Sequence, residues 1–401
     1  MNAKQTVDEL RPRVRAAMPD VRAGLERLAR IPSLSAPGYD PAPVRETARV
    51  TAELFTAAGV NTRVLEREGA HPAVVGRVEG PKGSPTVLLY AHHDVQPPGP
   101  RDRWRTDPFT PTGGLPGRRE GDAALRRGDH RRLIELAYWR ARDHHDAPGN
   151  ALVTVEVRVS DHAVHSGQFG GVVPDALMVL TRLLASLHDD QGRVAVTGLV
   201  SGDMEPLDLA EGEPRGWVGT RPSVKLIGDG SLTSRLWRKP SISIIGIDAT
   251  PVREASNTLW PVAAARLSMR VPIGQNAKKA QDALVAHLES HVPWGAELAV
   301  TRGPTGEAFS GPTSGPAYAA LKDALGAAWG REAIDVGQGG SIPFLFDVAR
   351  TFPGAALLVT GVEDPESNAH SENESLHLAE FENVCVAEAT FLGLFGASGR
   401  G

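Results

Sequence analysis

Residues 86–98 read Thr-Val-Leu-Leu-Tyr-Ala-His-His-Asp-Val-Gln-Pro-Pro, an apolar run that ends in a polar cluster. A short apolar run such as 86–90 predicts a strand buried on both faces, as in a parallel sheet covered by helices. Ligands of open α/β sheets bind where such strands end, so the polar cluster predicts a site. His92 and Asp94 point the same way along an extended chain, so one can bind a metal while the other holds its imidazole. A polar turn at a strand end is the alternative.

The rest of the chain shows two patterns of apolar and polar residues. In the outer parts, apolar spacing and composition predict helices over 6–30, 42–58, 316–328, 342–350 and 379–395, and strands over 73–78 and 355–360. In the middle part, residues 153–159 alternate strictly between apolar and polar, the pattern of a sheet with one face in water. Further elements of the middle part are strands over 242–248 and 263–271 and helices over 174–188 and 277–291.

The simplest organisation has two domains. An α/β domain is built from residues 1–150 and 304–401, and an α+β domain over 151–303 is inserted into it. Residues 113–150 fit neither pattern, because they hold eight arginines and no lysine and have little apolar periodicity. A solvated basic helix and loop explains this composition more simply than an RNA-binding patch, which would need interleaved aromatic residues.

A second polar motif lies near the end of the chain. Residues 368–374 read Asn-Ala-His-Ser-Glu-Asn-Glu and follow a predicted strand. His370, with carboxylates nearby, suits the other end of a metal site. The alternative is a helix start, in which Ser371 caps the helix and Glu374 closes a capping box.

Two glycine-containing motifs complete the set. Residues 339–344 read Gly-Gly-Ser-Ile-Pro-Phe, a turn that opens a helix, and its N–H groups can hold an anion such as a terminal carboxylate. Residues 161–171 read Asp-His-Ala-Val-His-Ser-Gly-Gln-Phe-Gly-Gly, where glycines let the backbone approach another group closely. A lone His in such a loop, such as His165, is usually just solvated.

These four motifs, in this order, resemble the M20 family of metallopeptidases, and most closely its dipeptidase branch, which includes carnosinases and non-specific cytosolic dipeptidases. The resemblance implies a zinc-peptidase-like catalytic α/β domain with an inserted ferredoxin-like lid, through which two chains form a homodimer. It also implies hydrolysis of dipeptides or short amides, with two zinc ions, or manganese, as the cofactor.

The resemblance also assigns roles to individual residues. His92 and His370 resemble terminal metal ligands, Asp94 the acid that supports His92, and Asp122 the bridging ligand. His165 resembles the lid histidine that stabilises the oxyanion, often from the partner subunit. The implied substrate contacts are Asn257, Arg270, Gly339, Gly340 and Ser341.

One stretch departs from the family pattern. The family continues Gly-Arg-Gly-x-x-Asp-Asp-Lys, whereas residues 117–124 read Gly-Arg-Arg-Glu-Gly-Asp-Ala-Ala. The strand that ends in the general-base Glu-Glu pair and the later strand that ends in an Asp ligand have no counterpart, and the arginine-rich 123–150 stands in their place. An internal deletion, or a frame slip, would explain both features.

The departure predicts impaired catalysis. Without the Glu, no group is placed to take the proton of the attacking water, and two fewer carboxylates leave too little charge for two dications. No motif supports Glu135, Asp143 or Asp146 as replacements.

Composition limits the other possibilities. A net charge of -5 argues against general binding to nucleic acid or acidic membranes, and the lone Cys385 excludes an intramolecular disulfide or a zinc–thiolate cluster. The N-terminal residues lack an apolar signal core, so we expect a cytoplasmic protein. Two alternatives to a small-peptide hydrolase remain: an amino-acid deacylase or desuccinylase of the same family, and a non-catalytic dimeric relative.

Overall fold

The structure is a computed structural model that describes residues 2–113, 142–204, 215–216, 218–311, 314–337, 343–362 and 367–398. The chain divides into two compact units. The first contains Met1–Asp143, Ser314–Ile334 and Thr360–Gly401, and the second contains His144–Thr313 and Asp335–Val359. Among the described residues, no helix is both long and apolar enough to cross a bilayer.

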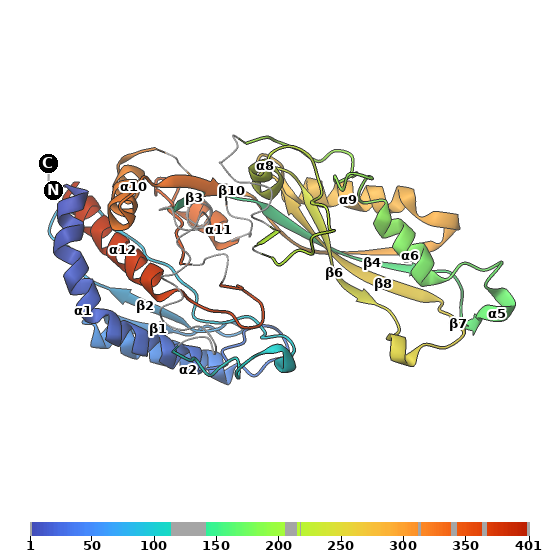
Figure 1. Ribbon diagram of the computed structural model, residues 1–401, viewed down its shortest axis with the longest axis horizontal. Helices are drawn as coiled ribbons and strands as arrows, with labels where there is room; N and C mark the ends of the chain where they lie inside the picture. Colours follow the sequence, from blue (N-terminus) through green and yellow to red (C-terminus); the bar gives the residue numbers. More distant parts are fainter. Residues whose placement is uncertain are drawn as a thin grey trace. The chain divides into compact units, whose positions relative to one another are not determined.

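The helices of the first unit agree with the apolar spacing of the sequence. They are α1 (Ala3–Ala29), α2 (Ala42–Ala57), α10 (Pro316–Trp329) and α12 (Leu378–Ser398). Helix α1 packs against α10 and α12 (Figure 1). It begins after Asn2, whose side chain accepts a hydrogen bond from the amide of Lys4. The predicted helices over 6–30, 42–58, 316–328 and 379–395 are therefore confirmed.

The strands of the first unit agree less well. Strand β1 (Asn61–Leu65) pairs antiparallel with β2 (Ala73–Arg77), which lies in the predicted segment 73–78. The predicted buried strand over 86–90 is wrong: the segment is not a strand, and Leu88 and Leu89 are 69% and 64% exposed. The predicted strand over 355–360 is also wrong. Neither segment belongs to a sheet among the described residues, and an apolar run cannot form a buried strand unless neighbouring strands satisfy its backbone.

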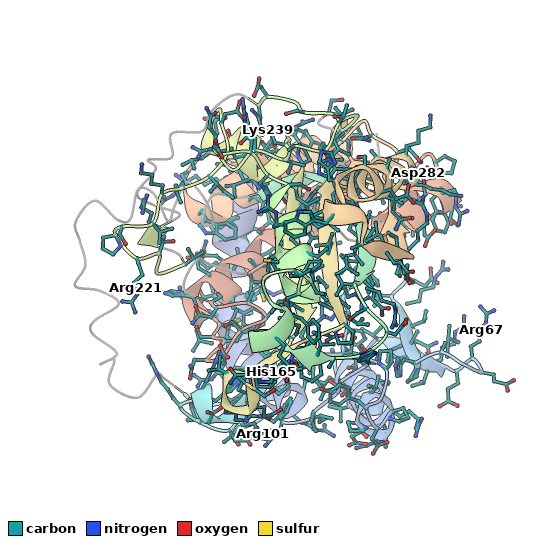
Figure 2. The ribbon with its side chains drawn as sticks, turned by 90° about the vertical axis from the view of Figure 1, so that its right-hand side faces the viewer. Arg67, Arg101, His165, Arg221, Lys239 and Asp282 are labelled. Carbon is teal, nitrogen blue, oxygen red and sulfur yellow. The ribbon has the colours of Figure 1, made fainter. Side chains whose placement is uncertain are left out.

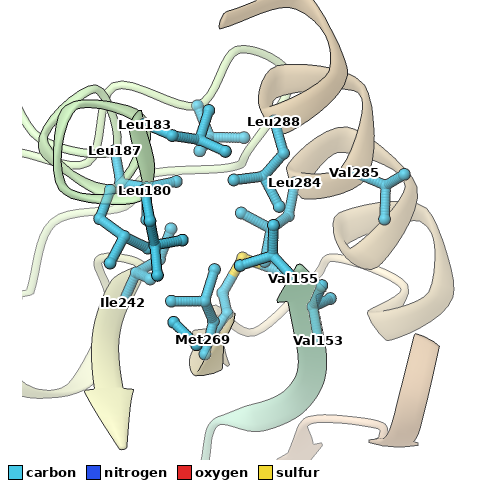
Figure 3. Close-up of a cluster of buried hydrophobic side chains, with 14 of the residues drawn as sticks. Val153, Val155, Leu180, Leu183, Leu187, Ile242, Met269, Leu284, Val285 and Leu288 are labelled. Atoms are coloured by element: carbon cyan, nitrogen blue, oxygen red, sulfur yellow. The ribbon is translucent and has the colours of Figure 1, made fainter. Parts of the chain in front are cut away.

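The second unit is built on a four-stranded antiparallel sheet in the order β6-β8-β4-β9. Its strands are β4 (Gly149–Arg158), β6 (Ser241–Asp248), β8 (Val262–Val271) and β9 (Glu297–Gly306). Helices α6 (Ala176–Ala185) and α9 (Ala277–His291) pack on this sheet. Figure 3 shows Val155, Met269, Leu180 and Leu284 meeting in the core between the sheet and these helices. The α+β pattern predicted for the middle of the chain is confirmed.

Several shorter elements complete the described fold. A three-stranded sheet has the order β10-β3-β11, formed by β3 (Arg142–Ala147), β10 (Phe309–Ser310) and β11 (Ile334–Gly337). The other short elements are β5 (Val164–His165), α5 (Ser166–Phe169), α8 (Leu232–Trp237), β7 (Thr258–Leu259), α11 (Pro343–Thr351) and the 3-10 turns Arg101–Arg103, Val252–Glu254 and Pro293–Gly295. Strand β3 lies inside the arginine-rich segment, where the sequence predicted no strand; it forms because β10 and β11 pair with it on either side.

Candidate active site

The His-His-Asp motif is held in place by the segment that follows α1. Leu34 forms a parallel bridge with Val95, and the amide of Val95 donates to the carbonyl of Ser33 at 3.0 Å. The hydroxyl of Ser33 donates to the carbonyl oxygen of His93 at 3.2 Å. The backbone around residues 93–95 is thus fixed by the loop that follows α1, and no strand of the described sheets pairs with it.

His92 is oriented by Asp94. Its Nδ1 lies 3.3 Å from Oδ1 of Asp94 and 2.9 Å from the carbonyl oxygen of the same residue. Both partners can only accept, so Nδ1 carries a proton, and in the neutral ring Nε2 then keeps its lone pair. The side chain of His92 is 72% exposed. An exposed Nε2 lone pair on a ring held by a carboxylate is the arrangement of a metal-ligating histidine.

Asp94 is itself held by a residue that the sequence did not single out. The hydroxyl of Ser35 donates to Oδ2 of Asp94. Burial raises the pKa of Asp94, but the hydrogen bond from Ser35, the residue's own backbone N–H and the nearby His92 and His93 outweigh it, so the pKa lies below its ordinary value. Asp94 is therefore ionised at neutral pH and can polarise His92. The only sequence signal for Ser35 was its place just after a predicted helix stop.

His93 makes contacts different from those of His92. Its Nε2 donates to the carbonyl oxygen of Pro72 at 3.0 Å, because a carbonyl can only accept. Its Nδ1 is buried without a hydrogen-bond partner among the described residues. His93 thus attaches the motif to the loop between β1 and β2. The alternation of an extended chain, which sends neighbouring side chains to opposite sides, could have predicted this division between the two histidines.

The second motif is a tight turn. Asn368, His370 and Asn373 have φ angles of 53°, 60° and 63°, in the left-handed region where Asn and His are enriched. The amide of Ser375 donates to the carbonyl of Ser367 at 2.8 Å and closes the turn. The alternative prediction, in which Ser371 caps a helix, is wrong because α12 begins only at Leu378.

Hydrogen bonds join this turn to the chain that follows the first motif. The amide of Arg105 donates to Oδ1 of Asn373 at 2.8 Å, and Nδ2 of Asn373 donates to the carbonyl oxygen of Arg103 at 3.1 Å. The Arg103 guanidinium lies 3.5 Å from Oε1 of Glu372. The backbone N–H of Glu372, then Ser371 and Arg103, hold the pKa of Glu372 below its ordinary value. The structure therefore brings together the segments that carry the first and the last motif. The distance between the imidazoles of His92 and His370 stays a prediction.

Other predicted site residues lie outside the described residues. They are Asp122, Gly339, Gly340 and Ser341, together with the candidate replacement Glu135. Among the described residues, no group of three His, Cys, Asp or Glu side chains is placed to hold a metal ion. The donors described so far fit a metal site in part: His92 has the orientation of a ligand, but the set is incomplete for a two-metal centre.

The predicted residues of the second unit lie in two places. His165 in β5 pairs with Thr258 in β7, and the amide of Ser166 donates to the carbonyl of Asn257 at 2.9 Å, so His165 and Asn257 share one end of the unit (Figures 1 and 2). Arg270 lies near the other end of β8, paired with Asn150 of β4. At about 3.3 Å per residue, the part of β8 up to Arg270 is about 26 Å long. The structure brings His165 and Asn257 together and keeps Arg270 apart from both.

The chain is similar to known dipeptidases. A family model described as "Peptidase dimerisation domain" matches residues 150–296. The "Cysteinylglycine-S-conjugate dipeptidase" of Corynebacterium striatum is 34% identical over 257 residues, which cover 62% of this chain but 55% of the relative. The "Cys-Gly metallodipeptidase DUG1" of Candida albicans is 22% identical over 409 residues and 81% of each chain. The chain thus spans just over half the length of the Corynebacterium relative.

The fold agrees over nearly the whole chain. Human carnosine dipeptidase 1 matches with a TM-score of 0.80 at 19% identity, covering 97% of this chain and 98% of the other. The dipeptidase Dug1p of Saccharomyces cerevisiae matches with a TM-score of 0.77 at 18% identity and covers 98% of both chains. Matches at this identity show the fold alone. Taken with the motifs and the sequence relatives, they show that the chain has the fold of M20 metallopeptidases and is similar to their carnosinase-like and Cys-Gly dipeptidase-like branch.

Proposed function

We propose that this chain hydrolyses dipeptides or related short amides at a site that includes His92, Asp94 and His370. The observation that carries the proposal is the hydrogen bonding of the first motif's chain to the last motif, at Arg105 and Asn373. The names of the relatives, which include Cys-Gly and β-Ala-His dipeptidases, support a small-peptide substrate. Zinc, or manganese, held by His92, Asp122 and His370, would supply the Lewis acid that activates water.

The residues of the chain itself then have separate tasks. Asp94 holds Nδ1 of His92 so that Nε2 faces outward. His165 donates a hydrogen bond to the oxyanion that forms when the amide carbonyl is attacked. Gly339, Gly340 and Ser341, which the sequence predicts to form a turn, bind the terminal carboxylate of the substrate through backbone N–H groups.

The geometry of the second unit supports a homodimeric site. A dipeptide spans only about 7 Å, whereas β8 separates the His165 end of the sheet from Arg270 by about 26 Å. One substrate cannot contact both residues of the same chain. We therefore propose that His165 and Asn257 serve one site of a homodimer and Arg270 serves the other, which is consistent with the dimerisation-domain match over 150–296.

We further propose that turnover is far below that of a complete family member. General-base catalysis contributes roughly 10²–10⁴-fold, and the family's general-base Glu has no counterpart in this sequence. The loss of two carboxylate ligands weakens metal binding further, so we expect at most one metal ion per chain. Asp143 and Asp146 in β3, like Glu135, are the carboxylates that could reduce this loss.

The test is hydrolysis of a dipeptide panel, including Cys-Gly and β-Ala-His, with added zinc or manganese, and with His92→Ala as the control. We expect slow turnover that His92→Ala abolishes. Fast turnover that is also abolished by His92→Ala would contradict the impairment and point to replacement carboxylates within 123–150. Hydrolysis of N-acyl amino acids alone would favour the deacylase, and a metal-free dimer without activity would favour the non-catalytic relative.

A further inference from the structure

The side chain of His165 is held by the residue two positions further along. The amide N–H of Gly167 donates to Nδ1 of His165 at 3.1 Å. A backbone amide can only donate, so Nδ1 must offer its lone pair. In the neutral ring, the single proton is then on Nε2.

The contact depends on the absence of a side chain at Gly167. A Cβ at this position would lie 3.0 Å from Cε1 and 3.2 Å from Nδ1 of His165, so the ring packs against the bare Cα. The backbone of Gly167 does not have a left-handed φ, so its own conformation does not require glycine. A Cβ at this position would therefore require the imidazole to move by a few tenths of an ångström.

The main chain around the ring is fixed independently. His165 pairs with Thr258, and the amide of the next residue, Ser166, donates to the carbonyl of Asn257. Because the amide of Gly167 occupies Nδ1, Nε2 is the ring nitrogen that can donate to another group. Figure 2 shows the side chain of His165 at the end of the unit that faces the viewer.

We propose that Gly167 is a positioning residue that holds His165 as its Nε2–H tautomer, so that the lid offers a hydrogen-bond donor to an anionic oxygen. This proposal rests on the proposed function for the identity of that anion, the oxyanion formed from a peptide carbonyl. It also excludes two other roles. A protonated Nε2 has no lone pair with which to bind a metal or to take a proton from water. If the proton moved to Nδ1, two N–H groups, that of the ring and that of Gly167, would face each other and the hydrogen bond would be lost.

The tautomer can be measured by NMR on the full chain labelled with ¹⁵N, without metal or substrate, at pH 8, where histidine is ordinarily neutral. The ring signals of His165 are identified by their loss in His165→Gln. We expect ¹⁵N shifts of a fixed Nε2–H tautomer and a scalar coupling between the Gly167 amide nitrogen and Nδ1. Shifts averaged over both tautomers with no coupling, or an Nδ1–H tautomer, would overturn the proposal.

A pair of variants separates positioning from general structure. Gly167→Ala keeps the amide donor but its Cβ displaces the ring, so it should weaken the coupling and move the ring shifts toward the averaged values of a solvated histidine. Gly171→Ala is the matched control, because it lies in the same loop and a Cβ there meets no atom within 4 Å; it should leave both signals unchanged. An unchanged tautomer in Gly167→Ala would show that Gly167 does not position the ring. Should Gly167→Ala fail to fold, the wild-type coupling still decides the question.

A zinc titration tests the excluded roles. The Nε2–H signal of His165 should persist at saturating zinc, and its loss would show that the ring is a metal ligand. These outcomes differ from a failure of the proposed function. A chain without peptidase activity but with the fixed tautomer would refute the dipeptidase proposal and keep the positioning role of Gly167.

Discussion

The sequence predicts a strand both within β4 and over the segment 86–90, yet only β4 forms one. Val153, Val155 and Val157 in β4 are fully buried, whereas Leu88 and Leu89 are mostly exposed. The difference lies in their neighbours. Strand β4 pairs with β8 on one side and β9 on the other, whereas 86–90 belongs to no sheet among the described residues. An apolar run thus predicts a tendency to be buried, and the strands beside it decide whether a strand forms.

The contrast follows from where the partners lie in the sequence. All four strands of the second unit's main sheet come from residues 149–306, and antiparallel pairing needs no crossover helix. A central parallel strand depends on crossover units that bring its neighbours from distant positions. Among the described residues, no strand from a distant part of the chain pairs with the 86–90 segment.

The largest effect is expected when the second unit is separated from the rest. A fragment covering 149–306 should fold alone, unfold cooperatively and elute as a dimer, because it contains the whole main sheet and its two covering helices. Circular dichroism and size-exclusion chromatography are the measurements. A disordered fragment would show that the unit depends on the other one and that self-contained pairing does not explain the comparison.

The sequence predicted the elements whose partners are local. Helix α9 and strand β6 begin and end within a residue of their predicted bounds, because apolar spacing and caps such as Asn276 are short-range signals. It also predicted that His92 and Asp94 would act as a pair. It could not predict Ser35 or Asn373, since both act through tertiary hydrogen bonds to segments far away in sequence. The left-handed turn at His370 was also missed, because no glycine marks it.

The same comparison predicts different costs for two truncations of leucine. Leu284→Ala removes a fully buried side chain between α9 and the sheet (Figure 3) and should destabilise the second unit by about 2–5 kcal/mol. Leu88→Ala, at 69% exposure, should change the free energy of unfolding by less than about 0.5 kcal/mol. Urea denaturation of the full chain measures both. A comparable loss from Leu88→Ala would mean that the 86–90 segment is buried after all.

A smaller effect, on zinc affinity, is expected from a change in the loop after α1 that holds the first motif. Ser35→Ala removes the hydrogen bond to Oδ2 of Asp94. Mutation of residues that hold metal ligands in place typically weakens metal binding 10–100-fold. Because Ser35 acts on His92 only through Asp94, we expect a loss of zinc affinity at the lower end of this range. Isothermal titration calorimetry with zinc is the measurement. Ser160→Ala, which removes an exposed hydroxyl in the second unit, is the control. Equal zinc affinity in Ser35→Ala and wild type would remove Ser35 from the site.

The smallest effect concerns the pH dependence of the stability of the second unit, through a histidine buried in its core. His287 on α9 is buried, lies 3.0 Å from the hydroxyl of Ser186 and stacks on His291. Burial, and then the neighbouring His291, lower the pKa of His287 below its ordinary value, while the contact with Ser186 acts in the opposite direction. Burial also lowers the pKa of His188, against the opposing charge of Asp189.

A folded-state pKa below the unfolded value fixes the sign of the effect. As pH falls below about 6.5, the unfolded chain takes up a proton before the folded one, so the stability of the second unit decreases. Melting temperatures between pH 8 and 5 should therefore fall more steeply in wild type than in His287→Gln, where Gln can still bond to Ser186, with His188 accounting for part of the slope that remains. His162→Gln, in an exposed loop, should keep the wild-type slope. If His287→Gln left the slope unchanged, the acid sensitivity would have to come from groups outside the packed core between α6 and α9.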